Sequence, residues 1–195
     1  MALLNQWFGI EPPYCDYGKS AVVIIPAPYE GTVSYGTGAG RGPEAVRQAS
    51  HYVEEMDGIT GTEPFRAGIH GREPLSMPED PWQASLQVKA AVGRELETGR
   101  RPVTVGGEHS LTVGAVSAAL ERYPGLSVLQ LDAHADLRDE YTGTKFSHAC
   151  VMRRVYDLGA GFVQAGVRSM SPEEKEWLSA HDREVISARR IRSDG

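Results

Sequence analysis

The sequence predicts an α/β fold in which helices cover both faces of a mainly parallel sheet. Short apolar runs alternate with helical segments along most of the chain, an order typical of parallel strands joined by helices. Residues 21–25 form a continuous apolar run closed by Pro26, as expected of a central strand covered on both faces. Ligands of such sheets bind beyond the carboxyl ends of the strands.

The composition is that of an ordinary soluble protein. The 195 residues are 41% hydrophobic and 24% charged, and the net charge is −6 with no run of basic residues. This argues against disorder and against nucleic acid or an anionic membrane as the main partner. The two cysteines form no C-x-x-C pair, no apolar run could span a membrane, and no basic residue precedes Lys19. We expect one domain, residues 1–195, in the cytoplasm.

A glycine-rich loop and a helix follow the first strand. Residues 28–43 contain five glycines, without the spacing of a dinucleotide-binding or phosphate-binding loop. A helix begins with Pro43 at its first position. Its inner face is predicted to consist of Ala45, Val46 and Ala49.

Residues 67–99 predict a short edge strand and a longer helix. The strand covers residues 67–69. Asp80 is the predicted N-cap of the helix, Pro81 its first residue and Gly99 its C-terminal stop. The inner face is predicted to follow Leu86, Ala90, Val92 or Gly93, and Leu96 or Glu97.

The next two predicted strands both end in side chains that can bind a metal. Residues 101–105 form a strand that ends in the turn Gly106-Gly-Glu-His-Ser110, and a helix then runs from residue 111 to about 123. Its buried stripe is marked by Val113, Val116 and Leu120. Val128, Leu129 and Leu131 then predict a buried strand.

Asp132, His134 and Asp136 follow this strand at a spacing of two. Residues two apart in extended chain point to the same side, so these side chains should converge. Carboxylates with a neutral imidazole suit Mn, Fe, Co or Zn better than Ca or Mg. The alternative for this stretch alone is a polar loop after a core strand.

The last third continues the alternation of helices and strands. A helix is predicted from about residue 148 to 158 and a strand over residues 161–165. Ser171 and Glu174 form a capping box that starts a helix through Ala180. Residues 184–187 predict a last strand, and a further helix begins at residue 188.

The turn Gly106-Gly-Glu-His-Ser110 and the segment Leu131-Asp-Ala-His-Ala-Asp136 together resemble the ureohydrolase family, which includes arginase and agmatinase. Residues 137–153 are similar to the agmatinase branch, and the glycine-rich loop to the family's N-terminal region. The resemblance implies an arginase-like three-layer α/β/α sandwich. It also implies that hydroxide bridging two Mn ions hydrolyses a guanidino group to urea and an amine.

The resemblance also assigns roles to the metal-type side chains. His109 and Asp136 would bind the first ion. His134 would bind the second ion, and Asp132 would bridge the two.

Other side chains near the mouth of the site receive roles in the same way. His148 would shuttle a proton to the leaving amine, and the alternative is a residue that only caps its helix. Asp139 and Glu140 would attract the distal ammonium of agmatine, or would simply be solvated. Glu108 is expected to be structural rather than a ligand, and Glu30 stands where many relatives carry aspartate.

Agmatine, hydrolysed to putrescine and urea, is the favoured substrate. Arginase has an asparagine-containing loop for the amino-acid head group, whereas no asparagine lies between Asp136 and His148. Guanidinobutyrate, arginine and formiminoglutamate are the alternative substrates. Relatives form trimers or hexamers, so a homo-oligomer is expected.

One part of the family's pattern is missing from the sequence. The family supplies two further aspartate ligands from a D-x-D segment on a later strand, and the aspartates after residue 157 are Asp182 and Asp194, neither in such a motif. We therefore expect a ureohydrolase domain incomplete at its C-terminus, which holds at most one ion well and has little activity. A non-catalytic ureohydrolase-like subunit and a simple metal-binding module are the alternatives.

Overall fold

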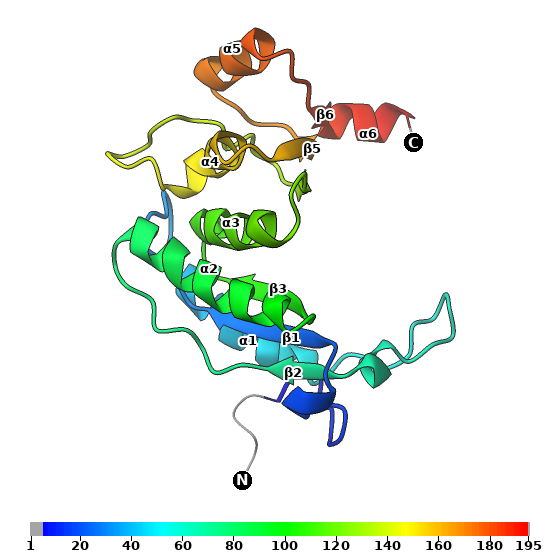
Figure 1. Ribbon diagram of the computed structural model, residues 1–195. Coiled ribbons are helices and arrows are strands. Elements are labelled where there is room, and N and C mark those ends of the chain that lie inside the picture. Colours follow the sequence, from blue (N-terminus) through cyan, green and yellow to red (C-terminus); the bar gives the residue numbers. More distant parts are fainter. Residues whose placement is uncertain (1–5, 195) are drawn as a thin grey trace.

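The computed structural model describes residues 6–194 and contains two parallel sheets joined by packed helices (Figure 1). The strands are β1 Val22–Ala27, β2 Ile69–Gly71, β3 Arg101–Gly106, β4 Ser127–Leu131, β5 Gly161–Val167 and β6 Ile186–Ser187. The α-helices are α1 Gly42–Ser50, α2 Pro81–Glu97, α3 Thr112–Arg122, α4 Val151–Asp157, α5 Pro172–Ala180 and α6 Ala188–Asp194. Short 3₁₀ helices are η1 Tyr17–Lys19, η2 Ala39–Arg41, η3 Pro64–Ala67, η4 His109–Leu111 and η5 His148–Cys150.

Every strand pairing within the described residues is parallel, which confirms the predicted α/β class. The first sheet has the order β2-β1-β3 and the second the order β4-β5-β6. β1 is the central strand of the first sheet and is buried along almost its whole length, as predicted. Within residues 6–194, β3 pairs only with β1 and β4 pairs only with β5. Each of these two strands therefore has one free edge.

Helix α3 connects the two halves of the molecule. Its residues Val113 and Val116 belong to the hydrophobic core of the second sheet, whereas Ala118 belongs to the core of the first sheet. On its other side α3 packs closely against α2, and the stacked order α2, α3, α4 is visible in Figure 1. The contact requires a glycine, because a Cβ on Gly114 would lie 2.0 Å from the carbonyl oxygen of Ser85 in α2.

The predicted starts of α2 and α5 are confirmed by their caps. Asp80 accepts a hydrogen bond from the backbone N–H of Gln83, and Pro81 is the first residue of α2. Ser171 and Glu174 form the predicted capping box of α5. Gly99 follows α2 with φ +78°, the left-handed conformation expected of a C-terminal stop.

The inner face predicted for α1 is wrong. Ala45, Val46 and Ala49 are exposed, and the buried residues are Pro43 and Ser50. The buried face contains a serine because the Ser50 hydroxyl donates to the carbonyl of Arg47 and accepts the backbone N–H of Phe8. A pattern of apolar residues cannot detect a polar side chain that is buried because it is hydrogen-bonded.

The inner face predicted for α2 is correct only in part. Val92 and Leu96 are buried as expected, but Ala90 is exposed and Leu86 is half-buried. The seven buried residues of the helix are Ala84, Ser85, Val88, Ala91, Val92, Glu95 and Leu96.

Glu95 can lie on the inner face of α2 because its charge has partners. Its carboxylate pairs with the guanidinium of Arg72 and accepts the Tyr17 hydroxyl. A buried carboxylate with such partners avoids the free-energy cost of an unpaired buried charge. The apolar periodicity of the sequence could not include this residue.

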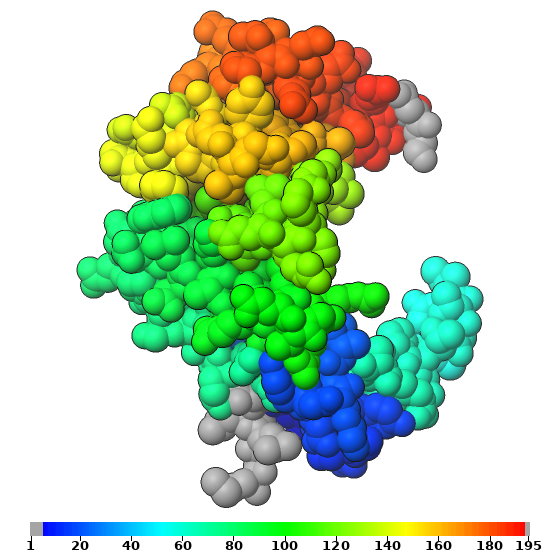
Figure 2. Space-filling view, in the orientation of Figure 1, coloured from blue at the N-terminus to red at the C-terminus, as the bar shows by residue number. Residues whose placement is uncertain are grey.

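The prediction that β4 is a buried strand is also wrong for Leu129 and Leu131, whereas Val128 is half-buried. The side chains of Leu129 and Leu131 are 64% and 77% exposed, whereas Gln130 on the opposite face is buried. In the described residues, helices cover only one face of this strand. Figure 2 shows the molecule as an open arc, with a hollow between α6 and the loop near residues 50–60. None of the helices in residues 6–194 has the length and apolarity needed to cross a membrane.

Candidate metal centre

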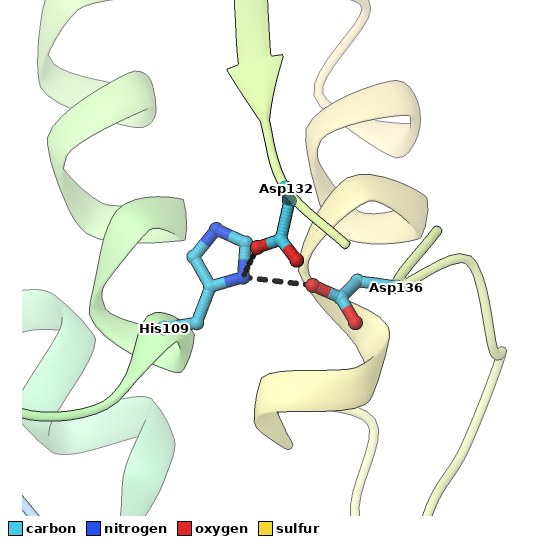
Figure 3. Close-up of side chains that lie close together, drawn as sticks. All are labelled: His109, Asp132 and Asp136. Atoms are coloured by element: carbon cyan, nitrogen blue, oxygen red, sulfur yellow. Dashed lines mark hydrogen bonds and ion pairs between the residues drawn. The ribbon is translucent and has the colours of Figure 1, made fainter. Parts of the chain in front are cut away.

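Three of the four predicted ligands converge where β3 and β4 end. His109 is the first residue of η4, just after β3, and Asp132 directly follows β4 (Figure 3). The Nδ1 atom of His109 lies 2.8 Å from Oδ2 of Asp136 and 3.7 Å from Oδ2 of Asp132. One ligand atom from each residue lies within 4.8 Å of the others. This spacing lets one cation contact all three side chains.

His134 lies beside this cluster on its open side. Its Nδ1 atom is 3.4 Å from Oδ1 of Asp132, and its side chain is 64% exposed. Its backbone N–H donates to the same carboxylate oxygen, and a bridge to Ser169 fixes the backbone. The imidazole can therefore reach an ion that Asp132 shares, but it does not belong to the group of three.

The backbone of Asp136 is held in an unusual conformation. Its φ angle is +52°, in the left-handed region that short polar residues such as aspartate tolerate best. The carbonyl of Asp136 accepts the backbone N–H groups of Met152 and Arg153 at the start of α4. The turn therefore directs the carboxylate toward His109 while its backbone anchors the next helix.

A chain of buried amides orients the Asp136 carboxylate. Gln130 Nε2 donates to Oδ2 of Asp136 at 3.3 Å, and Gln164 Nε2 donates to Gln130 Oε1 and to the carbonyl of Ala135. Sequence reasoning missed both glutamines. Their signal is a polar residue at matching positions of two otherwise apolar strands, since Gln130 and Gln164 are paired in the register of β4 and β5.

Glu174 supports the same turn from the other side. The sequence predicted it only as the capping residue of α5, and its Oε2 accepts the backbone N–H of Ser171. Its Oε1 accepts the backbone N–H of Leu137 at 2.9 Å, in a position where Glu174 is buried. One side chain thus holds the start of α5 against the residue that follows Asp136.

The site also includes the glycine-rich loop between β1 and α1. Both carboxylate oxygens of Glu30 accept the backbone N–H of Gly38, and Oε2 also accepts that of Gly40. The N–H groups of Gly40 and Gly38 lower the pKa of Glu30. A glutamate at this position, where many relatives carry aspartate, is therefore compatible with an ordered loop.

His148 lies at the mouth of the cluster, at the start of η5, where sequence reasoning expected it. Its Nε2 is 3.1 Å from the Ser34 hydroxyl oxygen and its Nδ1 is 3.3 Å from the Thr32 hydroxyl oxygen, both from the glycine-rich loop. The ring of Tyr141 meets the imidazole edge-on, with centroids 5.7 Å apart. Thr32 and Ser34 gave no signal in the sequence, because they are more than a hundred residues away from His148.

Asp139 and Glu140 are not brought into the site. Asp139 pairs with Arg154 at 2.6 Å and with Lys145 at 3.2 Å, and hydrogen bonds from these two cations lower its pKa. Glu140 is exposed on the same loop, and neither residue lines the cavity of the cluster. Their predicted role toward a substrate has no support in these contacts.

The cluster opens into a cavity of about 550 Å³, a size typical of small-molecule sites. Its wall includes His109, Asp132, His134, Asp136, Tyr141 and His148. Two carboxylates and two imidazoles at one end form a donor set suited to a divalent transition metal. The hydroxyls and the imidazole at the mouth can bind polar groups and move protons.

The sequence is similar to known proteins along almost its whole length. The model of the Arginase family matches residues 20–195. An N(1)-aminopropylagmatine ureohydrolase of Synechocystis sp. is 37% identical over 183 residues, which cover 90% of this chain and 60% of the relative. An agmatinase of Pyrococcus horikoshii is 32% identical over 191 residues, covering 93% of this chain and 64% of the relative.

Solved structures show the same relationship. The agmatine ureohydrolase of Thermoplasma volcanium superimposes with a TM-score of 0.87 at 30% identity, and the match covers all of this chain and 65% of that one. This chain spans about 60% of the length of the curated relatives it matches first.

Proposed function

This chain belongs to the arginase family, and from that membership we propose that its metal centre takes part in the hydrolysis of a guanidino group to urea and an amine. The observation that carries the proposal is the convergence of His109, Asp132 and Asp136, with one ligand atom of each within 4.8 Å of the others. These residues come from the carboxyl ends of two parallel strands, where ligands of such folds bind.

The side chains fit one metal ion well. His109 Nδ1 and the carboxylates of Asp132 and Asp136 would hold it, and the buried amide of Gln130 would keep the Asp136 carboxylate in place. When bound, a divalent transition metal lowers the pKa of water so that an anionic nucleophile is available near neutral pH. A second ion would have His134 and Asp132. We propose Mn, the metal implied by the family resemblance.

A strand added to either free sheet edge could supply further ligands. β3 and β4 both run toward the cluster, and each has one unpaired edge in the described residues. A strand that paired in parallel with β3 or β4 would place its own carboxyl end beside His109 or Asp132. We propose this as the position of the D-x-D ligands, a motif that the 195 residues do not contain.

We propose that His148 exchanges protons with the substrate's leaving amine. Its imidazole lines the same cavity as the cluster and is half-buried, and an imidazole can both accept and donate a proton. The edge-on ring of Tyr141 restricts the imidazole from one side. The hydroxyl of Ser34 gives it a polar neighbour at the mouth.

Agmatine and N(1)-aminopropylagmatine are the proposed substrates, because they are the compounds that the names of the two relatives described above specify. Both are guanidinium compounds with a distal amine. The cavity wall carries three carboxylates, Asp132, Asp136 and Glu174, and one cation, Arg138, so its own charge before a metal binds is net negative. The second candidate is a non-catalytic subunit, which is favoured by the exposed position of His134.

The first test is a titration with Mn²⁺ followed by calorimetry. We expect Asp136→Asn to weaken binding by at least tenfold relative to the wild-type chain, because it removes an anionic ligand. Asp16→Asn is the matched control, since Asp16 is exposed near the N-terminus, and it should bind like the wild type. Equal Mn²⁺ binding by the wild type and the Asp136→Asn variant would refute the metal centre.

The second test is a substrate panel with Mn²⁺ present. Urea release is measured from agmatine, N(1)-aminopropylagmatine, arginine and guanidinobutyrate, and formamide release from formiminoglutamate. Binding of Mn²⁺ without turnover of any of these would favour the non-catalytic subunit.

A further inference from the structure

Glu108 is a buried carboxylate next to a metal ligand, but its hydrogen bonds all go elsewhere. Its Oε2 accepts the backbone N–H groups of Gly31 at 2.9 Å and Thr32 at 2.6 Å. Its Oε1 accepts the hydroxyls of Thr32 at 2.5 Å and Ser110 at 2.6 Å. The carboxylate therefore ties the glycine-rich loop to the turn after β3.

The Thr32 hydroxyl lies between Glu108 and His148. A threonine hydroxyl has one hydrogen to donate, and the short contact to a carboxylate is the strongest place for it. The oxygen of Thr32 can then only accept hydrogen bonds from His148. The backbone N–H of His148 reaches this oxygen at 3.1 Å, and the Nδ1 atom lies 3.3 Å from it.

We propose that Glu108, acting through the Thr32 hydroxyl, holds His148 in the neutral tautomer that carries its hydrogen on Nδ1. Nδ1–H then donates to Thr32, and Nε2 keeps a lone pair at the cavity mouth beside the Ser34 hydroxyl, whose oxygen lies 3.1 Å from Nε2 and 3.3 Å from the Tyr141 hydroxyl. Glu108 and Thr32 are positioning residues. The value of this tautomer rests on the proposed function, because a free Nε2 is the atom that could take up and deliver a proton at the cavity.

The Ser147 hydroxyl could favour the other neutral tautomer of His148, which carries its hydrogen on Nε2. Its hydroxyl oxygen is also 3.3 Å from Nδ1, so its hydrogen could be donated to an unprotonated Nδ1. The lone pair of that Nδ1 would then face the oxygen of Thr32, whose hydrogen is held by Glu108, and the two lone pairs would repel. A hydrogen on Nδ1 avoids this repulsion because both hydroxyl oxygens can accept it.

The two tautomers differ in a spectroscopic signature that needs neither metal nor substrate. Long-range ¹H–¹⁵N correlation of the ¹⁵N-labelled 195-residue chain separates the protonated ring nitrogen from the unprotonated one. The spectrum is recorded about two pH units above the ordinary histidine pKa of about 6.5. The His148 signals are assigned by their loss in His148→Gln.

We expect the wild-type chain to carry the hydrogen on Nδ1. In Glu108→Gln, the new amide can accept the two backbone N–H groups only by pointing its NH₂ at Thr32. The Thr32 hydrogen is then free to turn toward Nδ1, so the variant should switch to the Nε2–H tautomer. A wild-type spectrum with the hydrogen on Nε2, or the same tautomer in both proteins, would overturn the proposal.

Two substitutions of Thr32 test the proposed tautomer if Glu108→Gln does not fold. Thr32→Val keeps the shape of the side chain without its hydroxyl and should lose the preference for Nδ1–H, whereas Thr32→Ser should keep it. Equal spectra for these two variants would contradict the proposal. Because no turnover is measured, an inactive chain with the expected tautomer would count against the proposed function alone.

Discussion

Two glycines inside helices should respond in opposite ways to the same substitution. Gly114 in α3 touches the backbone of α2, and a Cβ there would lie 2.0 Å from the carbonyl oxygen of Ser85. Gly93 in α2 has open space, with no heavy atom within 4 Å of such a Cβ. Neither glycine has a positive φ angle. Alanine is therefore conformationally allowed at both positions, and only the packing differs.

The expected changes in the free energy of unfolding follow from this difference. Alanine in place of a helical glycine gains about 0.5–1 kcal/mol, so Gly93→Ala should stabilise the chain by about that amount. In Gly114→Ala the two backbones must separate by roughly 1 Å, and overpacking of this kind costs about 1–3 kcal/mol or more. After subtraction of the helical gain, we expect Gly114→Ala to destabilise the chain by about 1–2 kcal/mol.

Thermal unfolding followed by circular dichroism measures both effects. For a chain of this size, about 1 kcal/mol corresponds to roughly 2–4 °C in Tm. Gly93→Ala should raise Tm by a few degrees and Gly114→Ala should lower it by about twice as much. If both variants gained stability equally, the close contact between α2 and α3 would not exist as described.

Two further substitutions and one labelling experiment test the surroundings of the site. Glu174→Gln should lower the free energy of unfolding by about 1–3 kcal/mol and weaken Mn²⁺ binding in a calorimetric titration. The single amide oxygen cannot accept both the Leu137 N–H and the Ser171 N–H that the two carboxylate oxygens accept. An unchanged free energy of unfolding together with unchanged Mn²⁺ binding would contradict this. Asp139→Asn should cost less than about 1 kcal/mol near neutral pH, measured by urea unfolding. Arg154 lowers the pKa of Asp139 in the folded chain. The stability that the Asp139 carboxylate contributes is therefore fully present above the unfolded pKa of about 3.9 and disappears as the pH falls through the folded pKa. A stability difference between wild type and Asp139→Asn that grew as the pH fell would refute this. Cys150 should resist labelling by iodoacetamide in the folded chain, because burial raises the pKa of its thiol to about 11. Mass spectrometry measures the labelling rate, and a rate equal to that of an unfolded control would show that the thiol is accessible.

The sequence predicted the fold class and the grouping of His109, Asp132 and Asp136 because both follow from local patterns. Alternating strands and helices indicate a parallel sheet, and a spacing of two after a strand directs Asp132 and Asp136 to one side. His109 could be included because it also follows a strand end. These signals need only the chain's own periodicity and the rule that parallel strands end at one edge.

The remaining features depend on neighbours that are distant in sequence. Leu129 looked buried, but whether a strand face is covered depends on which helices pack there. The pairing of Gln130 with Gln164 depends on the register of β4 and β5, which neither strand encodes alone. The contact of Thr32 with His148 arises only after the glycine-rich loop folds over the second sheet.

The position of the proposed metal ligands on two different sheets has a mechanical consequence. His109 follows a strand of the first sheet, whereas Asp132 and Asp136 follow a strand of the second, and the two sheets are not hydrogen-bonded to each other in residues 6–194. An ion held by these side chains would act as a cross-link between two half-molecules that otherwise meet through packed helices and through the contacts of Thr32 and Ser34 with His148. Loading the site would then stiffen the arc of the molecule.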